Sequence, residues 1–321
     1  MRDARLLRNL LLPFVLYLLL SLVFTYPLLT HFATHVPGSE TWAFDEYTFV
    51  YNLWWFKHAL LDLGVNPLYS DYIWVPVGIN FVLYTYTLFN AAVALPLLPA
   101  LGLIASSNLL MLLSTALSGF ATYLLVCYLL GRRPGARPIA FIAGLVYAFA
   151  ANRFVYLALG HYDMVSTEWL PLFALFLLKT LRERRVINPV LAGLSAAGAM
   201  LCEMIYGVFL ALLALILFAF EVGRRAAKEP ALASFRRLTA MLPRIGLMII
   251  TAGVAYAPVL TAIVREMRKG YILSGWGDAL KLSTDLLGFV TPAALNPLFG
   301  RDWVGELAAV RQGTARFADV N

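Results

Sequence analysis

Uninterrupted apolar blocks of about 20 residues most constrain the fold of this chain, because an α-helix needs about 20 apolar residues to cross the hydrocarbon core of a bilayer. The sequence is 61% hydrophobic and 13% charged, whereas a soluble domain averages about 45–50% apolar and about 25% charged residues. We therefore expect an all-α polytopic membrane protein with about seven transmembrane helices. The expected spans are roughly residues 10–29, 107–130, 138–158, 164–181, 187–203, 205–222 and 243–262.

Lysine and arginine gather in short clusters between the apolar blocks. Cytoplasmic loops carry an excess of these residues, and the four clusters fall on one side if the seven spans alternate. We therefore expect a multi-pass protein of the plasma membrane with a cytoplasmic N-terminus. The net charge of +7 is distributed as in cytoplasmic loops and not as on a nucleic-acid surface. The clusters are Arg2/Arg5/Arg8, Arg132/Arg133/Arg137, Lys179/Arg182/Arg184/Arg185 and Arg224/Arg225/Lys228/Arg236/Arg237/Arg244.

Residues 81–104 are apolar enough to form an eighth span, but such a span would invert every later loop. Pro96 and Pro99 interrupt the hydrogen bonding of a helix there, and Asn90 lies in the middle of the segment. We therefore predict an interfacial or re-entrant segment on the outer side.

Residues 30–106 then form one long extracytoplasmic loop, the first of the chain. The loop is net acidic and rich in aromatic residues, which favour the membrane interface. Residues 1–262 are expected to form a transmembrane module. Residues 263–321 are expected to remain outside, as the start of a truncated C-terminal region.

Two acidic segments that are far apart in the sequence fall on the expected outer face. Asp45 and Glu46 lie in the stretch TWAFDEYTFVYNLWW, where a partly desolvated carboxylate would suit a general base or a metal ligand. His161 and Asp163 lie in the turn after the third span, and such groups bind divalent metals or share a proton. The alternatives are a water-facing edge of an interfacial helix and an ordinary polar turn.

Three further polar residues lie near the same outer boundary. Arg153 falls inside the third span, near the helix face of His161, and an arginine within a span needs a partner. It could bind a lipid phosphate, or its side chain could reach the headgroups. Glu203 and Tyr206, between the fifth and sixth spans, could face a cavity or only cap a loop.

The chain combines one apolar span, a long first external loop carrying Asp-Glu and a short second external loop carrying Asp. It resembles the GT-C superfamily of integral-membrane glycosyltransferases, which use polyprenyl-phosphate-linked sugars. Looser similarity to bacterial members of the superfamily covers nearly the whole chain. The similar stretches are TYPLL, DEYTFVYNLWW, NPLYSDYIWVPVGINF, GLVYAFAANRFVYLALGHYDM, EWLPL and LSTDLLGFVTPAALNPLFG.

The resemblance implies roles for the acidic residues. Asp45, with Glu46 as the alternative, matches the catalytic carboxylate of the first external loop, and Asp163 matches the acidic position of the second. His161 lies where metal or substrate contacts occur, so Asp45, Asp163 and His161 are the implied ligands of a divalent cation, Mg or Mn. The second loop has a single carboxylate here, which departs from the metal-dependent members.

The resemblance also implies the reaction and its partners. A sugar would pass from a polyprenyl phosphate to a glycan, lipid or protein acceptor by an inverting mechanism, with the lipid tail beside residues 81–104. Arg153, Glu203 and Tyr206 are the further expected substrate-binding residues. The rival is a transporter or a subunit of a lipid flippase, which predicts polar residues at mid-span. Few occur, since the ionisable residues gather at the outer ends of the spans.

Overall fold

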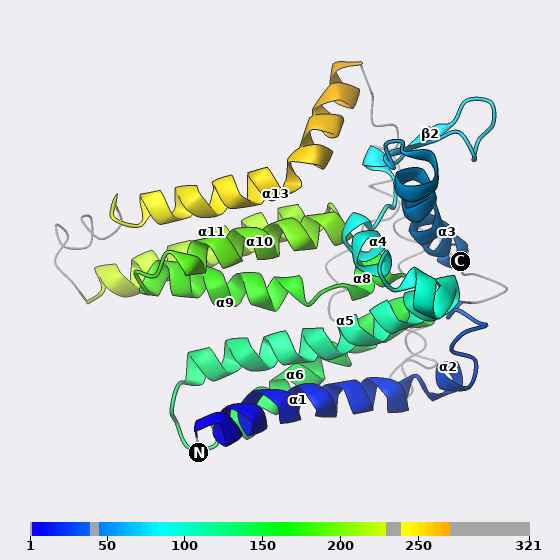
Figure 1. Ribbon diagram of the computed structural model, residues 1–321. Helices are drawn as coiled ribbons and strands as arrows, with labels where there is room; N and C mark the ends of the chain where they lie inside the picture. The colour runs from blue at the N-terminus through cyan, green and yellow to red at the C-terminus, as the bar shows by residue number, and fades with distance from the viewer. Residues whose placement is uncertain (1, 39–44, 229–238, 270–321) are drawn as a thin grey trace, which may run out of the picture. The chain divides into compact units, whose positions relative to one another are not determined.

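A computed structural model of the chain describes residues 2–38, 45–228 and 239–269, and within them the chain is mostly helical. Two short strands pair in an antiparallel hairpin, with Tyr69 opposite Asn80. The elements, in chain order, are α1 (Arg2–Phe24), α2 (Tyr26–Thr30), α3 (Glu46–Lys57), the π-helical turn η1 (His58–Leu63), β1 (Tyr69–Ser70), β2 (Ile79–Asn80), η2 (Phe81–Leu83), α4 (Leu88–Ala94), α5 (Leu98–Leu130), α6 (Ala136–Ala148), α7 (Ala151–Ala158), α8 (Tyr162–Val165), α9 (Trp169–Arg182), α10 (Ile187–Cys202), α11 (Tyr206–Ala226) and α13 (Leu242–Arg268) (Figure 1).

The chain divides into two compact units, Met1–Ile263 and Val264–Asn321. All contacts described below lie within the first unit. Of the segment 263–321, for which an extracytoplasmic position is expected, the residues beyond 269 lie outside the described part of the chain.

Each of the seven apolar segments is helical, but not each is long enough to span a membrane. Among the described residues, four helical stretches pass by length and composition, and the pair α6–α7, bent by 45°, makes a fifth if it is one span. Asn9–Phe24 and Ile187–Cys202 are shorter apolar helices. The fold is therefore that of an all-α membrane protein with four to five candidate spans, and the number seven stays a prediction. The four stretches are Leu98–Leu130, Tyr162–Arg182, Tyr206–Ala226 and Leu242–Arg268.

Residues 81–104 do not form one continuous helix. A single 3-10 turn and the seven-residue helix α4 are followed by a turn at Leu95–Leu97, beside Pro96. The chain then enters α5, which has non-helical backbone angles at Gly102. The break expected near the two prolines is present, because proline cannot donate the hydrogen bond that a continuous helix requires.

Helices α1, α5 and α6 pack closely through small residues (Figure 1). The buried Tyr17 of α1 donates a hydrogen bond of 2.9 Å to the carbonyl of Phe141 in α6. A Cβ added at Gly144 would lie 2.1 Å from the Tyr17 hydroxyl and 2.5 Å from the carbonyl oxygen of Gly119 in α5. Glycine at a helix contact lets backbones approach, as in many membrane bundles.

We expect Gly144→Ala to destabilise the protein by about 1–3 kcal/mol, because the added methyl group overpacks this contact. The thermal unfolding midpoint of the purified chain in detergent measures the effect. Gly246→Ala in α13 is the matched control, since a Cβ there meets nothing within 4 Å and alanine is the better helix former. Equal midpoints for the two variants would contradict the close approach of α5 and α6.

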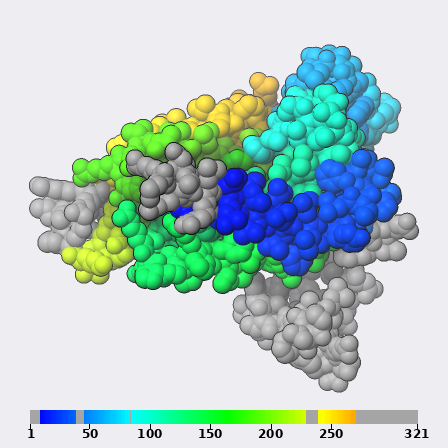
Figure 2. Space-filling model, turned by 60° about the horizontal axis from the view of Figure 1, so that its bottom comes forward, coloured from blue at the N-terminus to red at the C-terminus, as the bar shows by residue number. Residues whose placement is uncertain are grey.

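Helices α9, α10, α11 and α13 form a second packed group around Phe173, Leu177 and Met248. Large apolar side chains on the outer faces of α11 and α13, such as Leu215, Ile216 and Val254, are more than half exposed. Helix α1 also lies at the surface, drawn in dark blue in Figure 2. So much exposed apolar surface is typical of helices solvated by lipid.

Helix α3 packs across one end of the bundle, which positions the candidate site. Phe49 and Leu53 of α3 are fully buried against residues of α4, α5 and α8. The Tyr162 hydroxyl of α8 donates a hydrogen bond of 2.6 Å to the Phe49 carbonyl, and Asn90 of α4 donates one of 2.9 Å to Ser166. The N-terminus of α3 is thereby held over the turn between α7 and α8.

Candidate functional site

An imidazole ring joins the two acidic segments at this end of the bundle. His161 Nε2 lies 3.6 Å from Asp45 Oδ2, and His161 Nδ1 lies 3.9 Å from Asp163 Oδ1. The expected convergence of Asp45 and Asp163 is therefore present, with His161 between them. The packing of α3 on α8 brings Asp45 and Asp163 together, although they are far apart in the sequence.

Gly160 permits this approach. Its φ of +74° lies in the left-handed region, which glycine adopts at little cost. A Cβ at this position would lie 2.6 Å from the carbonyl oxygen of Pro37 and 2.9 Å from Glu46 Cβ. Pro37 and the first residue of α3 thus lie directly against the α7–α8 turn, and the Phe49 ring lies 5.3 Å from that of His161.

The three carboxylates differ sharply in exposure. The Asp45 side chain is 60% exposed and that of Asp163 is 3% exposed. Asp163 Oδ1 accepts a hydrogen bond of 2.7 Å from the Met164 amide. Glu46 is buried against Gly38 and Gly160, and its Oε2 has no hydrogen-bond partner among the described residues. Asp45 is therefore the carboxylate that a substrate can reach.

The ligand set expected for a cation does not fit a single ion. Asp45 and Asp163 approach different nitrogens of the His161 ring, and these nitrogens point away from each other. In the described part of the chain, no three His, Cys, Asp or Glu side chains are grouped to hold a metal. The geometry instead places the imidazole ring between the two carboxylates, at ion-pair distance from each.

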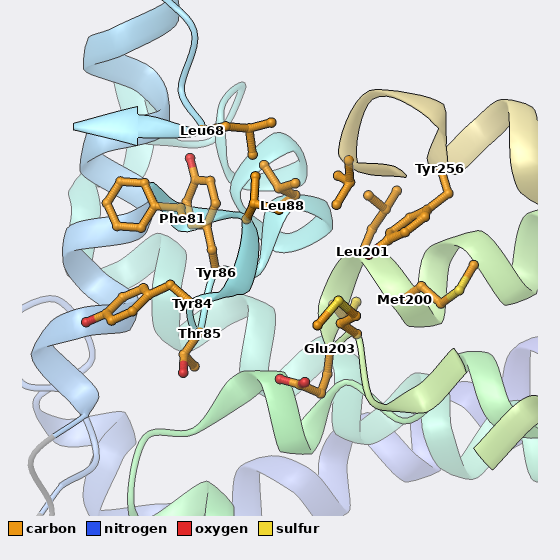
Figure 3. A pocket seen from close by; sticks show the side chains of 14 residues that line it. Leu68, Phe81, Tyr84, Thr85, Tyr86, Leu88, Met200, Leu201, Glu203 and Tyr256 are labelled. Atoms are coloured by element: carbon orange, nitrogen blue, oxygen red, sulfur yellow. The ribbon is translucent and has the colours of Figure 1, made fainter. Parts of the chain in front are cut away.

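Glu203 lies on the link between α10 and α11, close enough for its charge to act on Asp163. It lines a cavity of about 160 Å³ together with Thr85 and Tyr86 on one side and Tyr256 on the other. Figure 3 shows the Glu203 carboxylate on the side of the cavity that faces Thr85. The expectation that Glu203 faces a cavity, and does not only cap a loop, agrees with this position.

Tyr86 carries an unsatisfied polar group beside the same cavity. Its side chain is buried, and its hydroxyl has no hydrogen-bond partner among the described residues. Burial, and to a smaller extent Tyr51, raise the pKa of the Tyr86 phenol, so it remains a neutral donor. The hydroxyl oxygen itself is closed off from the cavity, and in Figure 3 it points towards Leu68 and away from Glu203. A buried hydroxyl without a partner is costly.

The Arg153 side chain makes its hydrogen bonds within the protein and does not extend to the lipid headgroups. Its guanidinium donates to the carbonyl of Ala148, at 2.7 Å, and to that of Val165, and its side chain is buried. Of the neighbouring charges, that of Glu168 contributes most to stabilising the charged guanidinium. The expectation that Arg153 shares a helix face with His161 is wrong, because α7 ends at Ala158 before the turn.

Tyr206 serves both packing and a groove. Its hydroxyl donates to the carbonyls of Asp163 and Met164, at 3.3 and 3.1 Å, which fixes α8 on α11. Its side chain also lines an apolar groove of about 750 Å³ between α6–α7 and α11, shared with Arg153 and Tyr156. The Tyr156 ring lies 5.9 Å from that of His161, so the groove reaches the acidic site.

Several residues at the site were not anticipated. Gly160, Tyr162, Tyr86 and Glu168 contribute through close approach, hydrogen bonding or charge. A glycine directly before a His-Tyr-Asp turn was the one available signal. The other three act through long-range packing, which leaves no local pattern.

Comparison of the chain with protein-family models, curated proteins and solved structures finds no match.

Proposed function

We propose that the protein is a glycosyltransferase that moves a sugar from a polyprenyl phosphate to an acceptor at the outer face of the membrane. The observation that carries the proposal is the open Asp45 carboxylate against His161 and the buried Asp163, beside an apolar groove that Tyr156 lines. The acceptor is a glycan, a lipid or a protein.

The reaction requires one base and one displacement. Asp45 removes the proton of the acceptor hydroxyl as its oxygen attacks the anomeric carbon. The bond from that carbon to the phosphate oxygen breaks, and the polyprenyl phosphate leaves with the electron pair. The configuration at the anomeric carbon is thus inverted and the proton rests on Asp45, with His161 Nε2 at ion-pair distance, 3.6 Å, from the carboxylate. No step depends on a cation.

The groove between α6–α7 and α11 supports a lipid donor. It is lined mainly by apolar side chains and ends at Tyr156 and Met164, next to His161 and Asp163. A polyprenyl chain in it would bring its phosphate towards the acidic site. In this proposal the polyprenyl tail lies in the groove, and not beside residues 81–104 as the resemblance implies.

The cavity at Glu203 supports a sugar subsite. Its volume of about 160 Å³ is well above the roughly 10–15 Å³ that a single water needs, which leaves room for a small polar molecule such as a monosaccharide. Glu203 offers hydrogen bonds to sugar hydroxyls, and polar groups that hydrogen-bond a substrate discriminate strongly between substrates.

Turnover tests the proposal. Purified chain in lipid vesicles is incubated with a panel of radiolabelled polyprenyl-phosphate sugars and a lipid extract as acceptor source. Release of polyprenyl phosphate and transfer of label are the expected results for one sugar of the panel. Equal release by vesicles with and without the protein, for every sugar, would reject the proposal.

We further predict that Asp71 lies outside the cell and Arg133 inside. In a background of Cys127→Ala and Cys202→Ala, an impermeant maleimide added to intact cells should label Asp71→Cys. Arg133→Cys should label only after the membrane is opened, because arginine-rich loops remain cytoplasmic. Both positions are exposed, so access depends on the membrane alone. The reverse labelling pattern would overturn the proposed orientation and a cytoplasmic N-terminus.

A further inference from the structure

A strongly basic cavity lies at the opposite end of the helices from the acidic site. Helix α9 begins at Trp169, close after Asp163, and ends at Arg182, which borders the cavity. The volume is about 290 Å³, and the walls come from the ends of α9 and α11 and the start of α13. The charged residues that line it are Arg182, Arg184, Arg224, Arg225, Lys228 and Arg244.

Backbone carbonyls fix two of these side chains. Arg225 donates a hydrogen bond of 2.5 Å to the carbonyl of Leu181. Arg244 donates one of 2.7 Å to the carbonyl of Thr180 and another to that of Glu183. The guanidinium groups are therefore oriented before any ligand binds, and preorganised groups bind at a lower entropic cost.

One carboxylate lies within ion-pair distance of the cationic residues in the described part of the chain. Glu221 Oε1 is 2.6 Å from Arg182, and Glu221 Oε2 is 2.8 Å from Arg224 and 3.9 Å from Arg225. The side chain of Glu221 is 2% exposed, and both its oxygens are occupied. Within the described residues it faces six cationic side chains, of which Arg224 and Arg225 make further interactions as well.

Positive charge is therefore in excess in the cavity. Arg184 and Lys228 have no ion-pair partner among the described residues, and Arg184 is near enough to Arg244 for their charges to repel. Arg184 and Lys228 are exposed, and like charges gathered around one cavity repel one another and attract anions. A ligand with several anionic oxygens relieves this repulsion, and the planar arginine side chain matches phosphate oxygens in pairs.

We propose that this cavity binds a phosphate group, supplied either by an anionic phospholipid or by a soluble phosphate compound. Basic pockets between helices at one membrane surface commonly take such headgroups. This phosphate site is separate from the proposed glycosyl-transfer site, and the proposal does not depend on that function.

Binding to the full-length chain, purified and delipidated in detergent, tests the site. The probes are dioctanoyl phosphatidylglycerol, dioctanoyl phosphatidylcholine and inorganic diphosphate, titrated by calorimetry. We expect saturable binding of one equivalent of an anionic probe and none of phosphatidylcholine. Tight binding of phosphatidylglycerol alone identifies a lipid headgroup as the source, whereas binding of diphosphate with equal or higher affinity identifies a soluble phosphate.

Two double variants decide whether the cavity is the site. Arg184→Gln with Lys228→Gln should raise the Kd by about fivefold for each cation removed. Neither residue has a described ion-pair partner, so folding should be retained, which the unfolding midpoint checks. Arg132→Gln with Arg133→Gln removes two exposed cations of the α5–α6 turn, outside the cavity, and should leave the Kd unchanged. Equal weakening in both double variants, or no saturable binding to the wild type, would overturn the proposal.

Discussion

Replacing Asp45 with asparagine is expected to slow sugar transfer by about 10²–10⁴-fold, the usual loss when a general base is removed. Asparagine keeps the shape of the side chain but cannot accept the acceptor's proton. The unfolding midpoint should not change, because the Asp45 side chain is 60% exposed and makes no capping hydrogen bond to α3. Initial rates with the donor sugar and thermal unfolding together measure the effect.

Asp71→Asn is the matched control for this variant. Asp71 is another exposed carboxylate of residues 30–106, and it lies outside the acidic site. Its rate should equal that of the wild type. If Asp45→Asn retains wild-type turnover while Asp163→Asn does not, the base lies elsewhere in the site. If neither variant alters turnover, the Asp45–His161–Asp163 group has no part in the reaction.

Replacing Gly160 with alanine is the second change with a large expected effect. The backbone at φ +74° is unfavourable for alanine, and the new methyl group would lie 2.6 Å from the Pro37 carbonyl oxygen. Pro37 and the start of α3 must then move away from the α7–α8 turn, which separates Asp45 from His161. A displacement of about 1 Å at a catalytic group can cost about 100-fold in rate, and we expect a loss of that order.

Gly64→Ala separates the backbone cost of alanine at a positive φ from the cost of the steric contact. Gly64 has φ +66°, so alanine meets the same backbone cost, but nothing lies within 4 Å of an added Cβ. We expect Gly160→Ala to be less stable than Gly64→Ala by about 1–3 kcal/mol, the cost of overpacking. Gly64→Ala should keep full turnover. Equal stability and turnover in the two variants would show that Gly160 does not hold the acidic segments together.

Hydropathy and charge determine the class of fold in this chain. The apolar blocks are helical, and the break near Pro96 and Pro99 is present, because helix length and proline geometry are local properties of the chain. The alternation of spans also predicts that Asp45 and Asp163 lie at the same end of the bundle. Hydropathy does not determine the number of spans, since α10 is an apolar helix that is shorter than a membrane-spanning helix.

Contacts between distant segments decide how the site residues are used. The sequence alone identifies Asp45, Glu46 and Asp163 as acidic candidates, but not that Asp45 is open while Glu46 is buried against Gly160. Arg153 reads as a phosphate ligand until packing shows its guanidinium bonded to the carbonyls of Ala148 and Val165.

The sequence by itself thus determines what is local: the helices, their breaks and the end of the bundle at which each charge lies. The tertiary structure alone decides which carboxylate meets His161, which hydroxyl is buried without a partner and which arginines converge. Burial and hydrogen bonding depend on neighbours far along the chain, as when α3 packs on α8 through Tyr162 and Phe49. No periodicity within one segment carries that information.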